Sequence, residues 1–381
     1  MSVQVLSRSQ AGTLSASARE VVEYRKSGLS LNHIVGCPLD CAYCIRHTYG
    51  LWDQRQPRAL MSDSEAVAQL VGHRYFRPHV TPLQLLNRAT DPFLAQVKGN
   101  TFAVLEDLDT RRLRNHVLVI TRCPVSDADC ERLAALSHVR LTLLFTYSGI
   151  EDQRIEPYPS HVAAGSLKTA SGYQPRRYRT VLYWRPLVPG LNDSPRHLGQ
   201  AAALSGSADA TVFTGLFFRD EIAAYYRANK LPTPYGETAR RKIMPETLEQ
   251  RVLAAFREHG GGRLFRKTSC AVSYAHWLPD YNGHFGIREL CDICPAAQLA
   301  LCAAARQVPT AEQVTQAAKA LPEAAGLQVM DITDRAVVVN GLLSEQPRYF
   351  LQHALGYQVH DAAHPHRPHR HGRAEIGWEQ A

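Results

Sequence analysis

The chain has 381 residues, of which 45% are hydrophobic and 20% charged, and its formal net charge is +8 at pH 7. It contains no run of 18 apolar residues, which excludes a predicted transmembrane helix, and residues 1–20 lack the continuous apolar segment of a secretory signal peptide. We therefore expect a cytoplasmic protein without a membrane partner, whose positive charge suits either an anionic ligand or an ordinary solvated surface.

Apolar runs alternate with amphipathic stretches from residue 31 onward, after a polar lead-in over residues 1–30. Six of these runs are rich in Val, Leu and Thr and nearly continuously apolar, as strands buried on both faces should be. The predicted strands are 31–36, 82–87, 116–121, 139–147, 180–186 and 211–217.

Helices are predicted between these strands. Ser62 and Glu65 have the spacing of a capping box, and the turn residues at 192–195 precede another helix. The predicted helices are 62–75, 93–106, 126–136, 194–206 and 219–228. Strands that alternate with helices indicate a parallel sheet with right-handed crossovers, and six units are too few for a closed eight-stranded barrel. We expect an α/β fold, an open partial (βα)6 barrel over residues 31–245.

The pattern changes after about Met244. A helix is predicted over 246–258, ending at three consecutive glycines, and four cysteines lie in the remainder of a segment that ends at residue 306. Residues 307–360 are predicted to form a small α/β module with a strand at 336–340 and a helix at 345–355. Residues 361–381 are rich in His and Arg and are expected to be disordered.

Nine cysteines occur, and seven of them fall into two clusters. In a chain without a secretory signal, clustered cysteines indicate metal ligands rather than disulfides. Cys123 and Cys130 stand apart from the clusters, and we interpret them as structural.

The first cluster has the sequence GCPLDCAYC, which places Cys37, Cys41 and Cys44 directly after a predicted strand. A loop at this place can supply three thiolates to a [4Fe–4S] cluster and leave one iron without a protein ligand, open for chemistry. A zinc site would more often pair one C-x2-C with a second, or with histidines.

This motif resembles the radical SAM (S-adenosylmethionine) superfamily, and its surroundings resemble the spore-photoproduct-lyase-like subgroup. The similar segments are SGLSLNHIVGCPLDCAYC, ATDPF, HVLVITRCPVSDAD, FTYSGIEDQRIEPYPSH and RPLVPGLND, which follow one another over about residues 28–195. The resemblance implies a radical SAM partial barrel and a cluster whose open iron chelates SAM. It also implies an external electron donor such as flavodoxin or ferredoxin, reductive cleavage to a 5′-deoxyadenosyl radical, and hydrogen abstraction from a substrate carbon. The chain departs from the subgroup at Ile45, Arg46 and His47, where an aromatic-rich continuation is usual.

Several polar residues are candidates for binding SAM. The resemblance places Tyr43 near the adenine, and the others lie at predicted strand ends, where ligands bind in such folds. These are Asn87, Thr90, Arg122, Ser148 and Arg185. Arg122 could pair with the SAM carboxylate, and the hydroxyls could bind a ribose or an amino group; strand-end capping is the alternative for each.

Glu156 lies in one of the similar segments, after Ser148. Its carboxylate could bind ribose hydroxyls, or it could pair with Arg154 or Arg177 at the surface. The sequence leaves the two interpretations open.

The second cluster consists of Cys270, Cys291, Cys294 and Cys302, in a C-x20-C-x2-C-x7-C pattern. It resembles the auxiliary-cluster extensions of some radical SAM enzymes, so a second [4Fe–4S] cluster is favoured over zinc. Cys302 lies in an apolar, helix-like run and could be a buried free thiol instead. Four ligands would favour electron transfer, and three would leave an iron open to the substrate or allow loss of a sulfide.

We expect a radical SAM enzyme with two [4Fe–4S] clusters, acting on a small nucleoside- or sugar-like substrate in biosynthesis by rearrangement or sulfur insertion, as in thionucleoside antibiotics. The alternative is repair or modification of nucleic acid, with phosphate contacts from the basic run at 176–179. A non-enzymatic iron–sulfur carrier would leave the SAM-site resemblance unexplained.

Overall fold

The computed structural model describes residues 3–239, 242–341 and 344–363, with no account of the Arg288 side chain. The tail expected to be disordered comprises residues 361–381. Asp361 is instead the last residue of a strand, and residues 364–381 lie outside the described residues. In the described part of the chain, every helix is too short or too polar to cross a membrane.

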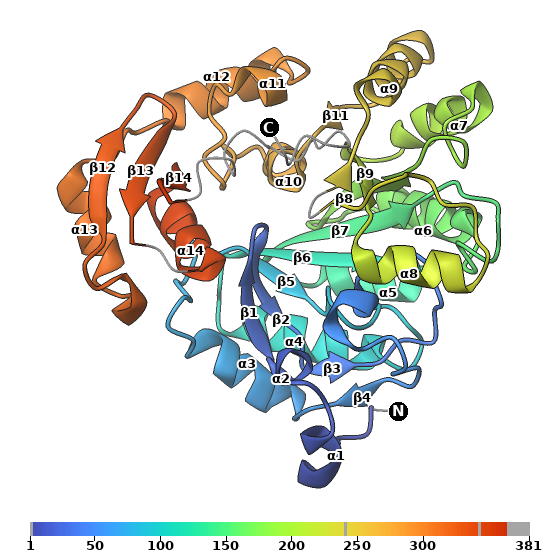
Figure 1. Ribbon diagram of the computed structural model, residues 1–381, viewed down its shortest axis with the longest axis horizontal. Coiled ribbons are helices and arrows are strands. Elements are labelled where there is room, and N and C mark those ends of the chain that lie inside the picture. The colour runs from blue at the N-terminus through green and yellow to red at the C-terminus, as the bar shows by residue number, and fades with distance from the viewer. Residues whose placement is uncertain (1–2, 240–241, 342–343, 364–381) are drawn as a thin grey trace.

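A parallel sheet of six strands forms the centre of the molecule (Figure 1). In sheet order these are β2 (Gly28–Leu31), β5 (Leu83–Leu85), β6 (His116–Thr121), β7 (Arg140–Tyr147), β8 (Arg179–Leu187) and β9 (Ala210–Phe217). Every neighbouring pair is parallel. The α/β fold with an open, mainly parallel sheet is therefore confirmed.

Short strands close the two edges of this sheet. β1 (Val22–Arg25) pairs antiparallel with β2 at one edge. At the other edge, β10 (Lys242–Ile243) pairs antiparallel and β11 (Leu264–Phe265) pairs parallel with β9. β1 and β10 stand at opposite ends of the strand order, so the sheet is open.

The predicted strand over 31–36 is wrong in its bounds. β2 ends at Leu31, and a separate strand, β3 (Ile34–Val35), pairs with β4 (Arg58–Ala59) in a small two-stranded sheet. The chain then turns at Gly36, where φ is +99° and a Cβ atom would lie 2.3 Å from the Gln56 carbonyl oxygen. Only glycine fits this position, which directs the backbone into the first cysteine loop.

Helices connect consecutive strands of the parallel sheet. They are α3 (Asp63–Val71), α4 (Lys98–Thr110), α5 (Asp127–Ala134), α6 (Ser160–Gly172) and α7 (Pro195–Ser205), and α8 (Asp220–Ala228) follows the last of these strands, β9. Ser62, Ser126 and Ser194 each accept a hydrogen bond from a backbone N–H in the first turn of α3, α5 and α7. These caps satisfy N–H groups that have no partner within the helix.

The helix α6 was not among the predicted helices. Its sequence is SHVAAGSLKTASG, and it buries mostly small side chains, including Ala163, Ser166 and Ala170. Such residues give only a weak apolar stripe, so periodicity did not identify it.

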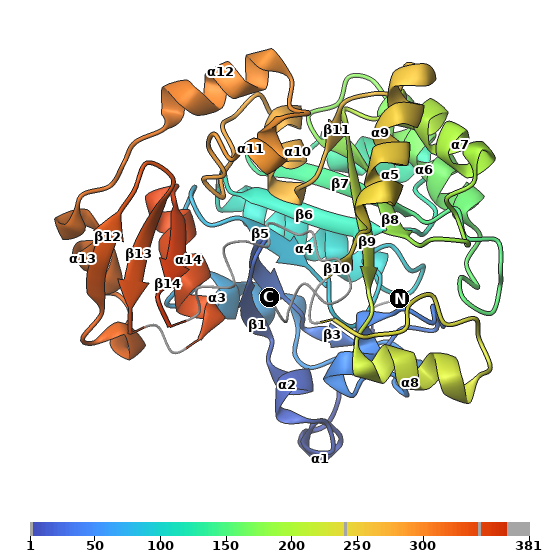
Figure 2. The same cartoon turned by 45° about the horizontal axis from the view of Figure 1, so that its top comes forward.

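Further short elements complete the chain (Figure 2). In the N-terminal half they are α1 (Arg8–Gly12), α2 (Ala16–Arg19) and the 3-10 helix η1 (Ile45–Tyr49). After the barrel come α9 (Glu246–Glu258), α10 (Thr268–Ala275), α11 (Arg288–Cys291) and α12 (Ala296–Ala305). The C-terminal module contains α13 (Ala311–Ala318), the 3-10 helix η2 (Pro322–Ala324), β12 (Gln328–Ile332), β13 (Ala336–Asn340), α14 (Glu345–Leu355) and β14 (Gln358–Asp361).

The C-terminal module is a three-stranded sheet, β12-β13-β14, and its helix α14 packs against β1. The Tyr24 hydroxyl lies 2.8 Å from His353 Nδ1, and Tyr24 also makes an edge contact with Phe350. The module thereby covers the β1 edge of the main sheet, which would otherwise expose unpaired backbone groups.

Alternate residues of the sheet face two different cores, as the period of two in a strand requires. One set, which includes Val119, packs with the crossover helices. The other set, which includes Leu118, Leu144 and Tyr183, packs with α10. The helix that carries Cys270 is therefore seated on the concave face of the sheet.

Candidate functional site

Arg46 holds the first cysteine loop in place from within. Its guanidinium is buried and donates hydrogen bonds to the carbonyl oxygens of Cys37 at 2.8 Å, Gln54 at 3.1 Å and Leu39 at 2.5 Å. A tight loop cannot pair its own carbonyls in a helix or a sheet, so it needs such a donor. Arg46 is one of the three residues at which the sequence differs from the subgroup that it resembles. Here its side chain holds the loop together.

Replacement of this arginine should weaken the loop strongly. Arg46→Met leaves several buried carbonyls without a donor, so we expect the unfolding free energy to fall by roughly 3 kcal/mol. Arg46→Lys should not restore the loop, because one ammonium cannot reproduce the planar fork. Thermal unfolding and iron bound per chain measure the effect, with Arg154→Met as a control at an exposed arginine. Wild-type iron and stability in Arg46→Met would contradict this role.

Two side chains, Arg122 and Glu156, contact the sulfur of Cys41, and Tyr43 contacts both of them. Arg122 Nη1 lies 3.2 Å from Cys41 Sγ and 2.7 Å from both carboxylate oxygens of Glu156, and Cys41 Sγ lies 3.4 Å from Glu156 Oε1. The Tyr43 hydroxyl donates to Glu156 and lies 3.0 Å from Arg122 Nη1. The structure therefore brings two predicted binding residues, Tyr43 and Arg122, together beside the first cysteine loop.

Glu156 is buried and pairs with Arg122, so its interpretation as a surface partner of Arg154 or Arg177 is wrong. Arg154 instead pairs with Asp152, its near neighbour in sequence. Although burial acts in the opposite direction, the negative groups around Arg122 hold its pKa well above the usual value. The guanidinium therefore stays charged at this site.

Asp91, within the ATDPF segment, fixes the backbone that carries Arg122. Its Oδ1 accepts from the Thr121 hydroxyl at 2.6 Å and from the Phe93 N–H at 2.9 Å, and its Oδ2 accepts from the Arg122 N–H at 2.9 Å. Asp91 was not among the predicted site residues, although the ATDPF segment that contains it marked this region of the sequence.

The thiols of the first cluster are hard to ionise without a cation. Burial raises the pKa of Cys37 to about 11, partly offset by the charge of Arg46. Burial also raises the pKa of Cys41 well above its usual value, against the opposing effect of Arg122. Binding of a metal would supply the positive charge that these thiolates need, with release of protons.

The three sulfurs of the first cysteine loop do not form a close group of ligands for a single ion. Among the described residues, one group of three potential ligand atoms lies within 4.8 Å of one another, and it does not contain Cys37, Cys41 or Cys44. Ligands of one zinc ion would converge more closely, whereas the thiolates of a [4Fe–4S] cluster bind different irons. The loop is therefore compatible with an iron–sulfur cluster, which stays the prediction for these three cysteines.

The other predicted SAM-binding residues differ in their surroundings. Asn87 donates to Gln84 at 2.7 Å, while Asn87 Oδ1 and Thr90 Oγ1 are buried and have no hydrogen-bond partner in the described part of the chain. Ser148 Oγ accepts from the Ile150 N–H and lies 3.1 Å from Ser160 Oγ, at the turn before α6. Its geometry is that of a capping group, the alternative stated above.

All four cysteines of the second cluster line one cavity of about 280 Å³. Cys270 comes from α10, Cys291 ends α11, Cys294 follows in the next turn and Cys302 comes from α12. Burial raises the pKa of each thiol, to about 12 for Cys294. Four cysteines that line one cavity are typical of a metal centre.

Cys302 is positioned as part of this cavity. Its Sγ accepts from the Asp280 N–H at 3.5 Å and from Gln298 Nε2 at 3.4 Å. Hydrogen bonds to sulfur are common around iron–sulfur clusters, where they tune the potential. The geometry favours Cys302 as a ligand, which stays a prediction.

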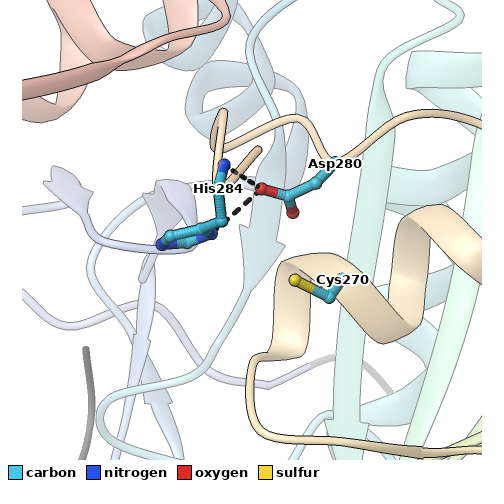
Figure 3. Close-up of side chains that lie close together, drawn as sticks. All are labelled: Cys270, Asp280 and His284. Atoms are coloured by element: carbon cyan, nitrogen blue, oxygen red, sulfur yellow. Dashed lines mark hydrogen bonds and ion pairs between the residues drawn. The ribbon is translucent and has the colours of Figure 1, made fainter. Parts of the chain in front are cut away.

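An acid and an imidazole face Cys270 (Figure 3). Ligand atoms of Cys270, Asp280 and His284 lie within 4.8 Å of one another. Asp280 Oδ2 accepts from the His284 N–H and lies 2.9 Å from His284 Nδ1. This arrangement is the one place among the described residues where a single ion such as zinc has three candidate ligands, so zinc stays an alternative at the second cluster.

The fold is only distantly similar to solved structures. Neither the models of protein families nor the curated protein sequences give a match. A single-site mutant of spore photoproduct lyase is similar at a TM-score of 0.48 and 14% identity, over 63% of this chain and 76% of that one. SuiB of Streptococcus suis bound to S-adenosylmethionine is similar at a TM-score of 0.42 and 10% identity, over 65% of this chain and 52% of that one. At these values neither likeness assigns a substrate.

Proposed function

We propose that the chain is a radical SAM enzyme whose first cluster is held by Cys37, Cys41 and Cys44. The observation that carries this proposal is the three-cysteine loop at the carboxyl ends of the parallel strands, stapled by Arg46 and lined by Arg122, Glu156 and Tyr43. Ligands of α/β folds bind at this end of the sheet. When bound, the reduced cluster supplies the electron that cleaves SAM to a 5′-deoxyadenosyl radical.

The residues beside Cys41 would bind and orient SAM. Arg122 offers a charged donor for a carboxylate, and Glu156 offers acceptors for an amino group or ribose hydroxyls. These two side chains pair with each other at 2.7 Å. Binding of SAM would replace this pair with contacts of the same kind, so neither charge would be left unpaired.

The second cysteine cavity is proposed to hold an auxiliary [4Fe–4S] cluster. Four converging thiols on the concave face of the sheet support it, because this position adjoins the interior of the barrel. We propose a small molecule as substrate, in keeping with a nucleoside- or sugar-like compound.

Formation of 5′-deoxyadenosine tests the proposed function. Protein reconstituted with iron and sulfide without oxygen, then given dithionite and SAM, should form this product at a rate well above that of the protein-free mixture. Chromatography of the quenched reaction measures it. Absence of 5′-deoxyadenosine, from protein with a full iron complement, would sink the proposal.

Nucleic acid as substrate is favoured by one surface feature, a basic depression of about 610 Å³. Its lining residues are His79, Arg111, Arg112, Arg114, His138 and Arg140. They lie where β6 and β7 begin, whereas Arg122 follows the end of β6 and contacts Cys41. Six residues of strand separate the two places by about 20 Å. Nucleic acid bound in the depression would therefore lie far from the first cysteine loop.

We accordingly expect weak, non-specific binding of DNA. Its dissociation constant at physiological salt should be roughly 10⁻⁴ to 10⁻⁶ M and should rise steeply with salt, because phosphate contacts release counterions. Arg112→Ala combined with Arg114→Ala should reduce this binding further. Fluorescence anisotropy of labelled duplex and single-stranded DNA over a salt series gives the values. Nanomolar, lesion-dependent affinity would overturn the small-molecule proposal in favour of repair.

A further inference from the structure

Four basic side chains from separate segments gather on the concave face, next to the second cysteine cavity. Arg185 belongs to β8, Lys242 begins β10, and Lys267 directly precedes α10. Lys26 lies on the turn between β1 and β2. Only Arg185 was among the predicted site residues, because the other three become its neighbours only in the folded chain.

Tyr183 connects two of these cations. Its buried hydroxyl lies 3.2 Å from Arg185 Nη1 and 3.4 Å from Thr268 Oγ1, and Lys242 Nζ lies 5.8 Å from the centre of its ring. Burial alone would raise the pKa of this phenol, yet the charges of Lys242 and Arg185 lower it to about 7. The positive potential here is strong enough to favour a bound anion.

Lys267 has no anionic partner to match its burial. Its side chain lines the cysteine cavity, the residue is 7% exposed, and Nζ has no hydrogen-bond acceptor in the described part of the chain. Burial and the neighbouring Lys26 lower its pKa well below the usual value. When Lys267 is neutral, its nitrogen can accept from the Lys26 ammonium, but the pair then keeps only one charge; an anion beside them would favour the charged form of both.

Lys26 and Lys242 are less enclosed than Lys267, because Lys26 is exposed to water and Lys242 is half-buried. Nearby protein still lowers the pKa of Lys26, and Glu345 acts weakly in the other direction. Burial lowers the pKa of Lys242 as well. Within the described ranges, neither Lys242 nor Lys267 forms an ion pair with a carboxylate. Ionised Tyr183 would neutralise only one of the four cations.

Cations that are grouped without counterions lower the stability of the fold. Their presence therefore indicates that they bind an anionic group. Neutralising the thiolates of the auxiliary cluster explains Lys267, which the negative charge of Cys270 influences. It does not explain Lys242 and Arg185, which face Tyr183 instead. A ligand with several anionic oxygens could bind Lys267 on one side and Lys242 and Arg185 on the other at the same time.

We propose that Lys26, Lys242, Lys267 and Arg185 bind the phosphoryl group of a small phosphorylated substrate beside the second cysteine cavity. The proposal rests on the proposed function, since it names the class of that substrate. A phosphate monoester carries about two negative charges and three acceptor oxygens, more than a carboxylate offers, so it suits four donors. Lysine ammoniums bind such groups as point charges, and an arginine can bind two oxygens at once.

Binding of inorganic phosphate tests this site directly. Equilibrium dialysis of radiolabelled phosphate against the cluster-loaded full chain should reveal one saturable site. Lys26→Met combined with Lys242→Met should weaken binding at least tenfold, because each removes a charge and neither residue is a cluster ligand. Lys168→Met, a matched change at an exposed lysine of α6, should leave binding unchanged. Acetate at the same concentration should not displace the label.

Thermal unfolding separates a binding role from a structural one. Removal of mutual repulsion should leave the double variant at least as stable as the wild-type protein, a pattern typical of functional sites. Equal phosphate binding in the wild-type and double variants, displacement by acetate, or a clear loss of stability would overturn the proposal.

The same samples distinguish this proposal from the proposed function. SAM cleavage without substrate depends on the first cysteine loop, so the double variant should retain it. Phosphate binding that is lost in the double variant, in protein that never cleaves SAM, would reject the radical SAM function and keep the anion site. Cleavage with equal phosphate binding in both proteins would reject the anion site alone.

Discussion

The variant with Cys37→Ala, Cys41→Ala and Cys44→Ala should lose SAM cleavage completely and keep about half of the iron. Two [4Fe–4S] clusters give about eight irons per chain, and the second site does not depend on these residues. Without the three thiolates there is no open iron to hold SAM, so formation of 5′-deoxyadenosine should fall to the protein-free rate.

The control for this variant is Cys130→Ala, which removes a buried thiol from α5. It should keep the full iron content and the wild-type rate of cleavage. Iron analysis and chromatography of 5′-deoxyadenosine provide both readouts. Cleavage at an unchanged rate in the triple variant would reject the assignment of the first cluster.

Cys291→Ala together with Cys294→Ala should remove the other half of the iron and leave SAM cleavage in place. Both cysteines line the second cavity, and neither contacts the first cysteine loop through a described hydrogen bond. Loss of two of four thiolates leaves too few ligands for a stable cluster. Cleavage of SAM without product formation should persist, because the first cysteine loop, which Arg46 holds by hydrogen bonds, is intact.

Cys302→Ala decides how many ligands the second cluster has. Since Cys302 Sγ lines the cavity and accepts two hydrogen bonds, we expect this variant to lose iron as well. Iron retained without Cys302 would indicate three protein ligands and an iron open to the substrate. Zinc in place of iron, in protein purified without oxygen, would contradict an auxiliary iron–sulfur cluster and favour the group formed by Cys270, Asp280 and His284.

The main sheet could be predicted because its strands are buried on both faces and therefore apolar throughout. Strand β6 has the predicted bounds, and β7 and β9 differ from the prediction by one residue at the start. The strand β12 was missed because it is largely exposed, and its sequence has no continuous apolar run. The strands that could be predicted were thus those with a continuous apolar run, whereas β14 is largely buried but has the mixed sequence QVHD and was missed.

The cysteines of the candidate site could be identified from spacing, but their surroundings could not. Arg122 and Glu156 are 34 residues apart, and a pattern of spacing cannot pair them. Arg46 has no motif that marks it as a partner of backbone carbonyls. Lys26 and Lys267 are 241 residues apart in sequence and meet only because α10 is seated on the concave face of the sheet.

Electron paramagnetic resonance of the Cys291→Ala/Cys294→Ala variant tests the central claim most directly. This variant should contain only the cluster bound by Cys37, Cys41 and Cys44, so its reduced spectrum has a single source. Addition of SAM should change that spectrum, because SAM would become a ligand of the open iron. A reduced [4Fe–4S] signal that stays the same at saturating SAM would contradict the account.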